Sequence, residues 1–238
     1  MFAVQEMWEK GEGKSVLAIV AALNEEEGIG PTIAELRQHL EKPWILVVDG
    51  WSRDRTVKVA KDMYADVMFQ QGSGKGNAIA EAIQHVKSTV GYVDYVVLTD
   101  ADYTYPAEFI PKMVKILDEN PSVGMVCGNR FNSHFKLKSM HNMLYLGNRL
   151  LAFTHNLLNG VNMRDPLTGL RVIRWEIVKD WKPKSRGFDV EVELNHLVER
   201  KGFEIVEIPI YYRPRLGEKK LKPKHGFTIL KRILLTSF

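Results

Sequence analysis

The chain has 238 residues, of which 45% are hydrophobic and 26% are charged, and its formal net charge is +4. This composition is typical of a globular protein and excludes a largely disordered chain. No apolar run approaches the roughly 20 residues that a membrane-spanning helix needs. The single cysteine, Cys127, excludes a disulfide framework, and its apolar surroundings VGMVCG favour a small buried side chain.

The length suits one α/β domain or two small ones, and no linker divides the chain. The amino terminus, MFAVQEMWEKGEGK, has acids among its apolar residues and lacks a long apolar core. It is therefore not typical of a signal peptide, and we expect the folded body to be cytoplasmic. The expected division is an extension over 1–14, one domain over 15–221 and a basic amphipathic helix over 222–238.

Short β-rich apolar runs alternate with helical patterns through the first half. Strands are expected at 15–23, 44–49, 95–99 and near 123–127. Helices are expected between them, and the last of these begins at Pro106. The apolar stripes that predict the other three helices are Ile33, Leu36 and Leu40; Val57, Ala60 and Tyr64; and Ile79, Ala82, Ile83 and Val86.

This alternation predicts right-handed βαβ crossovers and a mostly parallel sheet with helices on both faces. In such a sheet the ligand crevice lies beyond the carboxyl ends of the strands. Polar clusters at 24–26, 49–54 and 100–102 all fall at such ends. We therefore expect these clusters to converge in space.

The second half of the chain is less regular. A long helix is expected over 139–160, a short strand over 169–174, a helix over 189–202 and a strand over 203–212. The segment from 211 to 232 is rich in basic residues, which can serve nucleic acid, anionic phospholipid or a phosphorylated substrate.

The last helix, FTILKRILLTSF, is amphipathic. It sets apolar residues against two basic ones, Lys231 and Arg232. The pattern suits an interfacial helix in the headgroup region of a membrane, and it suits a core-packing helix equally well.

The stretch YVVLTDADYTYP places Asp100 and Asp102 where a buried strand ends. A solvated turn would explain both acids. In an extended backbone, however, residues i and i+2 point to the same side, so both carboxylates can face one point. That arrangement suits a hard divalent cation, Mg²⁺ or Mn²⁺, whose other ligands are nucleotide phosphates.

Two further segments suit a nucleotide. Asp49 stands at the carboxyl edge of the second strand, where an acid can accept from a ribose hydroxyl or a base N–H. Ser52 or Asp54, just beyond it, could instead cap the next helix. The glycine loop GSGKGNA lacks P-loop spacing, but Lys75 in it could reach a diphosphate or a base. A solvent-exposed turn explains this loop equally well.

Arginines recur in the second half, more than a single diphosphate requires. Guanidinium groups bind phosphate bidentately, which favours a second phosphate in the site. The histidines do not cluster at metal-ligand spacing, so zinc is not expected. The basic residues concerned are Arg130, Arg149, Arg171, Arg213, Arg215, Lys219 and Lys220.

Several segments, in this order along the chain, resemble family 2 glycosyltransferases with the GT-A fold. They are AALNEEEGI, VVDGWSRDRT, GKGNA, TDADYTYPAEF, GNRF, DPLTGLRVIR, GFDVEVEL and EIPIYYRPRLGEKKL. The resemblance runs from about Val16 to Leu221 and is to the dolichyl- or polyprenyl-phosphate hexose synthase branch. Within that branch the chain is most similar to the archaeal members that load dolichyl phosphate for protein N-glycosylation.

The resemblance implies a role for each matching residue. The nucleotide would be bound by Ala22, Asn24, Glu25, Asp49, Ser52 and Lys75, and the metal and diphosphate by Asp100 and Asp102. The acceptor phosphate would lie beside Arg130, Arg149, Arg215 and Lys220. The chain departs from its relatives at Thr104, where glutamine is common, and at Leu144, near which arginine is common. With threonine at position 104, the resemblance does not predict a third protein ligand for the metal.

The expected activity is inverting, metal-dependent transfer of a hexose or N-acetylhexosamine from a nucleotide-diphosphate sugar to dolichyl phosphate. A UDP-sugar is slightly favoured over GDP-mannose, no nucleic-acid partner is expected, and the protein would lie peripherally on the cytoplasmic face of the membrane. A lipid phosphate is already ionised, so its attack needs no general base. One alternative is a soluble transferase for a glycan or small alcohol, with Asp165 or Asp189 as the base. The other is a nucleotide-sensing or phospholipid-binding module without turnover.

Overall fold

The structure of the chain is a computed structural model. It describes residues 14–131, 151–157, 162–218 and 224–236. Two residues of the expected site, Arg149 and Lys220, lie outside these ranges, as does most of the expected extension over 1–14.

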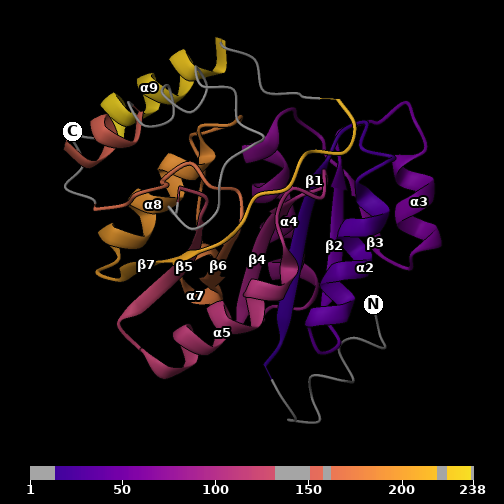
Figure 1. Cartoon of the computed structure of the whole chain (residues 1–238), viewed down its shortest axis with the longest axis horizontal. Coiled ribbons are helices and arrows are strands. Elements are labelled where there is room, and N and C mark those ends of the chain that lie inside the picture. The colour runs from indigo at the N-terminus through magenta and orange to yellow at the C-terminus, as the bar shows by residue number, and fades with distance from the viewer. Residues whose placement is uncertain (1–13, 132–150, 158–161, 219–223, 237–238) are drawn as a thin grey trace.

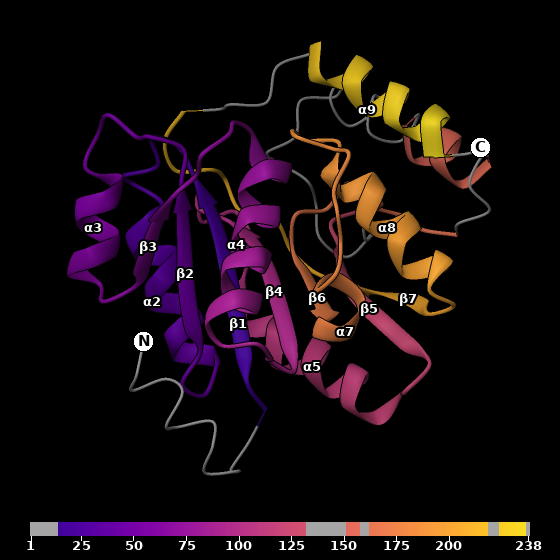
Figure 2. The same cartoon turned by 180° about the vertical axis from the view of Figure 1, so that it is seen from behind.

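A single mixed sheet crosses the described part of the chain (Figures 1 and 2). Its order is β3-β2-β1-β4-β6-β5-β7. Only β6 runs antiparallel to its neighbours, so the sheet is mostly parallel, as the alternation of strands and helices predicts. The strands are β1 Val16–Ala22, β2 Trp44–Asp49, β3 Asp66–Phe69, β4 Tyr95–Asp100, β5 Val123–Asn129, β6 Arg171–Arg174 and β7 Glu204–Pro209.

Helices cover both faces of the sheet (Figures 1 and 2). The helices α2 Ile29–His39, α3 Thr56–Asp62 and α5 Ile110–Glu119 pack on one face, and the short helix η1 Ala107–Phe109 leads into α5. The other face is covered by α4 Lys75–Thr89, α7 Trp175–Val178 and α8 Val190–Arg200. Residues 151–157 are also helical, and α9 is Lys224–Thr236.

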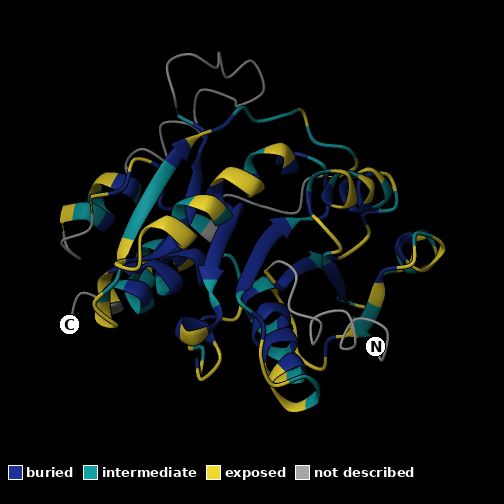
Figure 3. Cartoon of the chain, turned by 90° about the horizontal axis from the view of Figure 1, so that it is seen from below, coloured by how far each residue is buried: buried dark blue, intermediate teal, exposed yellow. Residues whose placement is uncertain are grey.

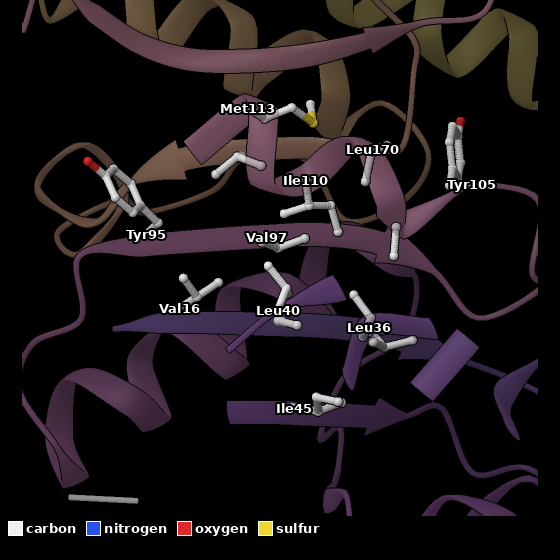
Figure 4. Close-up of a cluster of buried hydrophobic side chains, with 14 of the residues drawn as sticks. Val16, Leu36, Leu40, Ile45, Tyr95, Val97, Tyr105, Ile110, Met113 and Leu170 are labelled. Atoms are coloured by element: carbon white, nitrogen blue, oxygen red, sulfur yellow. The ribbon is translucent and has the colours of Figure 1, made fainter. Parts of the chain in front are cut away.

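The core has two layers because successive side chains of a strand point to opposite faces. In β1, Ala18 and Val20 belong to one cluster while Leu17 and Ile19 belong to the other. Central strands are therefore buried on both sides, and their apolar runs are continuous rather than alternating (Figure 3). Figure 4 shows the first layer, where Val97 of β4 lies below Ile110 of α5.

The last helix packs against the body of the protein. Ile229 and Ile233 of α9 are buried against Val192 of α8. Leu234 and Leu235, at the end of the helix, are exposed. One stripe of α9 is thus core-packing, which was one of the two interpretations of its pattern. No helix within the described ranges combines the length and the apolar character needed to span a bilayer.

Two local predictions differ from the structure. Tyr64 was expected on the buried stripe of the second helix, but α3 ends at Asp62 and Tyr64 has a left-handed φ of 56° and is 87% exposed. The edge strand β3 was not expected, because it is short and only partly buried. Its pairing with β2 depends on tertiary contact rather than on an apolar run of its own.

Candidate active site

The polar clusters at the strand ends meet at one edge of the sheet. Ala22 at the end of β1 is in register with Asp49 at the end of β2, and Ala21 is in register with Asp100 at the end of β4. Because β1 lies between β2 and β4, the segments that follow these three strands are neighbours. The convergence that the sequence predicts is therefore present.

Hydrogen bonds join the loop after β1 to the loop after β2. The backbone N–H of Asn24 donates to the Ser52 hydroxyl at 2.8 Å, and the Asn24 side chain accepts from the Arg53 N–H at 2.7 Å. The N–H of Glu25 donates to the Thr56 hydroxyl at 2.7 Å. Asn24 has a left-handed φ of 51°, a conformation that asparagine tolerates better than most residues. These bonds fix two of the expected nucleotide-binding segments against each other.

Asp49 is fully buried and is held by Ser52. Its Oδ1 accepts from the Ser52 backbone N–H at 2.8 Å, and its Oδ2 accepts from the Ser52 hydroxyl at 2.6 Å. Ser52 thus orients the carboxylate of Asp49 and does not cap the next helix through its side chain. Each carboxylate oxygen has a second lone pair, so Asp49 retains the capacity to accept from a ligand.

The glycines of the loop before α4 allow a close approach to the chain at 185–187. A Cβ on Gly74 would lie 2.3 Å from the Arg186 carbonyl oxygen, and one on Gly76 would lie 2.7 Å from that of Ser185. Gly74 also has a φ of +91°, which few other residues adopt. Packing against a loop of the second half therefore explains two glycines that the sequence associates with an anion.

Lys75, the first residue of α4, points to the end of β4. Its Nζ lies 2.5 Å from Asp100 Oδ1 and 2.8 Å from Glu191 Oε1 of α8. Burial opposes the charge of Lys75, but the two carboxylates outweigh this effect and raise its pKa. Lys75 therefore links Asp100, at the end of β4, to Glu191 in the second half of the chain.

Asp102 is buried and receives hydrogen bonds on both oxygens. Oδ1 accepts from the Thr104 hydroxyl at 2.6 Å and from its N–H at 3.1 Å, while Oδ2 accepts from Arg215 Nη1 at 2.8 Å. Arg215 also forms an ion pair with Glu25. Burial raises the pKa of Asp102, and the neighbouring charge of Asp100 adds to the rise, although Thr104 and Arg215 oppose it.

The basic carboxyl-terminal segment lies against the loop that carries Asp102. The Arg213 N–H donates to the Thr104 carbonyl at 3.0 Å, and the Leu216 N–H donates to the Asp102 carbonyl at 3.1 Å. The Arg213 guanidinium pairs with Glu35 of α2 through both of its terminal nitrogens. These contacts bring Arg215 to the site although it is 113 residues from Asp102 in the chain.

Arg130 has a buried carboxylate partner. Its Nε and Nη2 lie 2.7 Å from the two oxygens of Asp165, whose side chain has no exposed surface. The guanidinium carbon also lies 6.0 Å from the centre of the Tyr105 ring and 5.4 Å from that of Tyr212. The hydroxyl of Tyr105 accepts from the Gly169 N–H at 2.7 Å, which joins this pair to the site because Gly169 packs beside Asp100.

Asp100 and Asp102 form a donor set that suits a hard cation. Both offer only carboxylate oxygens, the ligands preferred by Mg²⁺ and Mn²⁺. A Cβ at position 169 would lie 2.8 Å from Asp100 Oδ2, so Gly169 keeps space beside that oxygen. Across the described residues, no three His, Cys, Asp or Glu side chains are grouped as a complete metal site. A cation here would therefore take its remaining ligand oxygens from water or from its substrate.

Most of the expected site residues lie along this edge: Ala22, Asn24, Glu25, Asp49, Ser52, Lys75, Asp100, Asp102 and Arg215. Arg130 is adjacent, and its guanidinium is engaged by Asp165. Glu191 was not expected. Its signal is present in GFDVEVEL, where an acid stands among apolar residues in the first turn of a helix, and it is 6% exposed.

Comparisons with known proteins identify the family of the chain. Residues 17–181 match the family described as Glycosyl transferase family 2. The chain is 32% identical over 211 residues to a dolichyl-phosphate hexose transferase of Haloferax volcanii, covering 87% of each chain. It is 25% identical over 244 residues to the UDP-N-acetylglucosamine–dolichyl-phosphate N-acetylglucosaminyltransferase of Methanococcus voltae, covering 93% of this chain and 96% of that one. The chain spans only 64% and 49% of the length of two other relatives that it matches.

A solved structure has the same fold. The glucosyl-3-phosphoglycerate synthase of Mycobacterium tuberculosis, crystallised with Mn²⁺, UDP-glucose and phosphoglyceric acid, superposes with a TM-score of 0.74 at 20% identity. The match covers 98% of this chain and 83% of that one. At this identity the likeness establishes the GT-A fold. The family match covers more than half of the chain, so the protein belongs to glycosyl transferase family 2 and is a glycosyltransferase.

Proposed function

We propose that the protein transfers a hexose or N-acetylhexosamine from a nucleotide-diphosphate sugar to dolichyl phosphate, with inversion at the sugar carbon. The observation that carries this proposal is the meeting of Asp100 and Asp102 with Lys75 and Arg215 at the carboxyl edge of the sheet. Such a site combines carboxylates for a divalent cation with fixed positive charges for phosphate groups. The name of the Haloferax relative supports a dolichyl-phosphate acceptor.

The donor is proposed to be a UDP-sugar. The name of the Methanococcus relative contains UDP-N-acetylglucosamine, which favours UDP over GDP. The buried carboxylate of Asp49, at the end of β2, would accept from the ribose or the base. The Asn24 N–H donates to the Ser52 hydroxyl, which in turn donates to Asp49, so these two residues hold the Asp49 carboxylate in position.

Asp100 and Asp102 would hold Mg²⁺ or Mn²⁺. When bound, the ion supplies positive charge that stabilises the departing nucleoside diphosphate. Lys75 and Arg215 lie beside the same aspartates and would hold the donor and acceptor phosphates close together. Arg149 and Lys220, outside the described residues, are proposed to bind the acceptor phosphate.

The acceptor is proposed to be an anion rather than an alcohol. An alcohol must lose a proton to a general base, whereas a phosphate is already ionised at neutral pH. The two acids that could act as such a base are both paired with arginines, Asp165 with Arg130 and Asp189 with Arg232. Both carboxylates are thus already engaged by guanidinium groups, which favours the phosphate acceptor.

A peripheral position on the cytoplasmic face of the membrane is also part of the proposal. The helix at 151–157 lies beside α9, with Leu151 packed near Ile229 and Ile233 (Figures 1 and 2). Large apolar side chains of both helices are exposed: Phe153, Leu157, Leu234 and Leu235. An apolar surface close to an exposed basic residue, here Lys231 of α9, is typical of binding to anionic lipid.

A transfer assay tests the function. The protein is incubated with radiolabelled UDP-glucose, UDP-N-acetylglucosamine or GDP-mannose, with and without dolichyl phosphate and Mn²⁺. We expect label in the lipid extract only when both additions are present, and we expect Asp102→Ala to lower the rate at least about a hundredfold in saturating metal. Transfer to a soluble alcohol without lipid phosphate, or full activity of Asp102→Ala, would contradict the proposal.

Vesicle flotation tests the membrane part. We expect the double variant Leu234→Glu and Leu235→Glu to lose binding to anionic vesicles. Tyr92→Glu, which changes another exposed large side chain away from α9, is the matched control and should bind like the wild type. Equal binding of all three proteins would refute this surface.

A further inference from the structure

The two aspartates of the proposed metal site share one pattern of ion pairs. Lys75 bridges Asp100 to Glu191, with its Nζ 2.5 Å from the aspartate and 2.8 Å from the glutamate. Arg215 bridges Asp102 to Glu25 in the same manner. Each aspartate is thus linked through one basic residue to one glutamate.

The two basic residues and the two glutamates have little contact with water. The side chains of Lys75 and Glu191 are 10% and 7% exposed, and those of Arg215 and Glu25 are 22% and 8% exposed. A charge in such surroundings is costly unless it has a partner of opposite sign. A basic residue that gave up its aspartate would therefore need another carboxylate within reach, and the glutamate already in contact provides one.

The count of charges agrees with this arrangement. Four carboxylates face two basic side chains in this cluster, which leaves a formal charge of −2. That deficit equals the charge of one divalent cation. The cluster is consequently balanced when a divalent ion joins it without any of the six side chains leaving.

We propose that Glu191 and Glu25 are positioning residues that keep Lys75 and Arg215 in the site when Asp100 and Asp102 engage a divalent cation. The inference rests on the proposed function, because it assumes that the two aspartates bind the metal. The glutamates act through the basic residues and do not contact the ion. Lys75 and Arg215 compete with the ion for the aspartates, and after its arrival they remain in the site, each held by its glutamate.

A double-mutant cycle on Mn²⁺ binding tests the role of Glu191 in holding Lys75. Binding of Mn²⁺ alone, without nucleotide, is followed by electron paramagnetic resonance for the wild type, Lys75→Met, Glu191→Gln and the double variant. We expect Glu191→Gln to weaken binding about tenfold, because displaced Lys75 has lost its second partner. We expect Lys75→Met to tighten binding, and Glu191→Gln to have less than about a threefold effect in the Lys75→Met background.

Additive effects would overturn the inference, because Glu191 would then act on the ion through its own charge. Glu199→Gln, which removes the same charge two turns further along α8, is the matched control and should bind Mn²⁺ like the wild type. Urea unfolding in EDTA verifies that each variant folds.

The same titration separates this inference from the proposed function. If Asp100→Asn leaves Mn²⁺ binding unchanged, the metal site itself is wrong and the inference fails with it. If Asp100→Asn abolishes binding but the cycle is additive, only the role of Glu191 is wrong. The cycle of Arg215→Met with Glu25→Gln repeats the test for Glu25 and Arg215, with the same expected coupling.

Discussion

Replacing Asp165 by asparagine removes the negative charge from a buried ion pair while keeping the size of the side chain. In the structure, Asp165 accepts from Arg130 Nε and Nη2 at 2.7 Å and from the Arg130 backbone N–H at 3.0 Å. The side chain of Arg130 is 9% exposed and that of Asp165 is 0% exposed, so water cannot solvate the guanidinium once its partner charge is lost. Removing one partner of a buried pair costs about 3–5 kcal/mol.

The structure favours the lower end of that range. Asparagine retains one oxygen that can accept from the Arg130 N–H, and the rings of Tyr105 and Tyr212 remain close to the guanidinium. We therefore expect Asp165→Asn to lower the free energy of unfolding by about 3 kcal/mol. With a slope of about 3 kcal/mol per M of urea, the midpoint of unfolding moves down by about 1 M.

Urea unfolding followed by tryptophan fluorescence measures this change. Asp62→Asn is the matched control, because Asp62 forms an exposed pair with Lys58 on α3 and its loss should cost less than about 0.5 kcal/mol. Adding Arg130→Met to Asp165→Asn should recover more than half of the loss, since the unpaired charge is removed. A midpoint for Asp165→Asn equal to that of Asp62→Asn would refute the reasoning.

Three further predictions concern other sites. Gly74→Ala should destabilise the protein more than Gly91→Ala. Both glycines have φ near +90°, but of the two only a Cβ at position 74 would meet backbone atoms, at the Arg186 carbonyl. Urea midpoints of the two variants measure the difference, and equal losses of stability would contradict the contact. Burial lowers the pKa of His155 from 6.5 to about 4, so the unfolded chain binds this proton first and stability falls as pH drops from about 6.5 to 4. The difference between the two pKa values corresponds to about 3 kcal/mol of unfolding free energy. His155→Gln should therefore lose much less stability over this pH range, and a variant with the same pH profile as the wild type would refute the prediction. Burial raises the pKa of the Cys127 thiol to about 12, so a thiol reagent should label the native protein far more slowly than the urea-unfolded one, and equal rates would exclude a buried thiol.

Local patterns in the sequence were sufficient for most of the fold. Runs such as YVVLT and stripes such as Ile79, Ala82, Ile83 and Val86 depend on periods of two and 3.6 residues, and the structure places them in β4 and on the buried face of α4. The position of the acids at strand ends followed from the same reasoning, because parallel strands share a carboxyl edge. The edge strand β3 was not predicted by these patterns, because it is identified by its pairing with β2 and not by a periodic apolar run of its own.

The partners of the charged residues were decided by the tertiary structure alone. Arg215 lies 113 residues from Asp102 and 190 from Glu25, and Lys75 joins Asp100 to a glutamate on α8. The sequence shows that Arg130 and Asp165 are both present, but only the fold buries them together. The physical reason is that periodicity is a property of neighbouring residues, whereas charge pairing depends on distance and on exclusion of water, which exist only once the chain is folded.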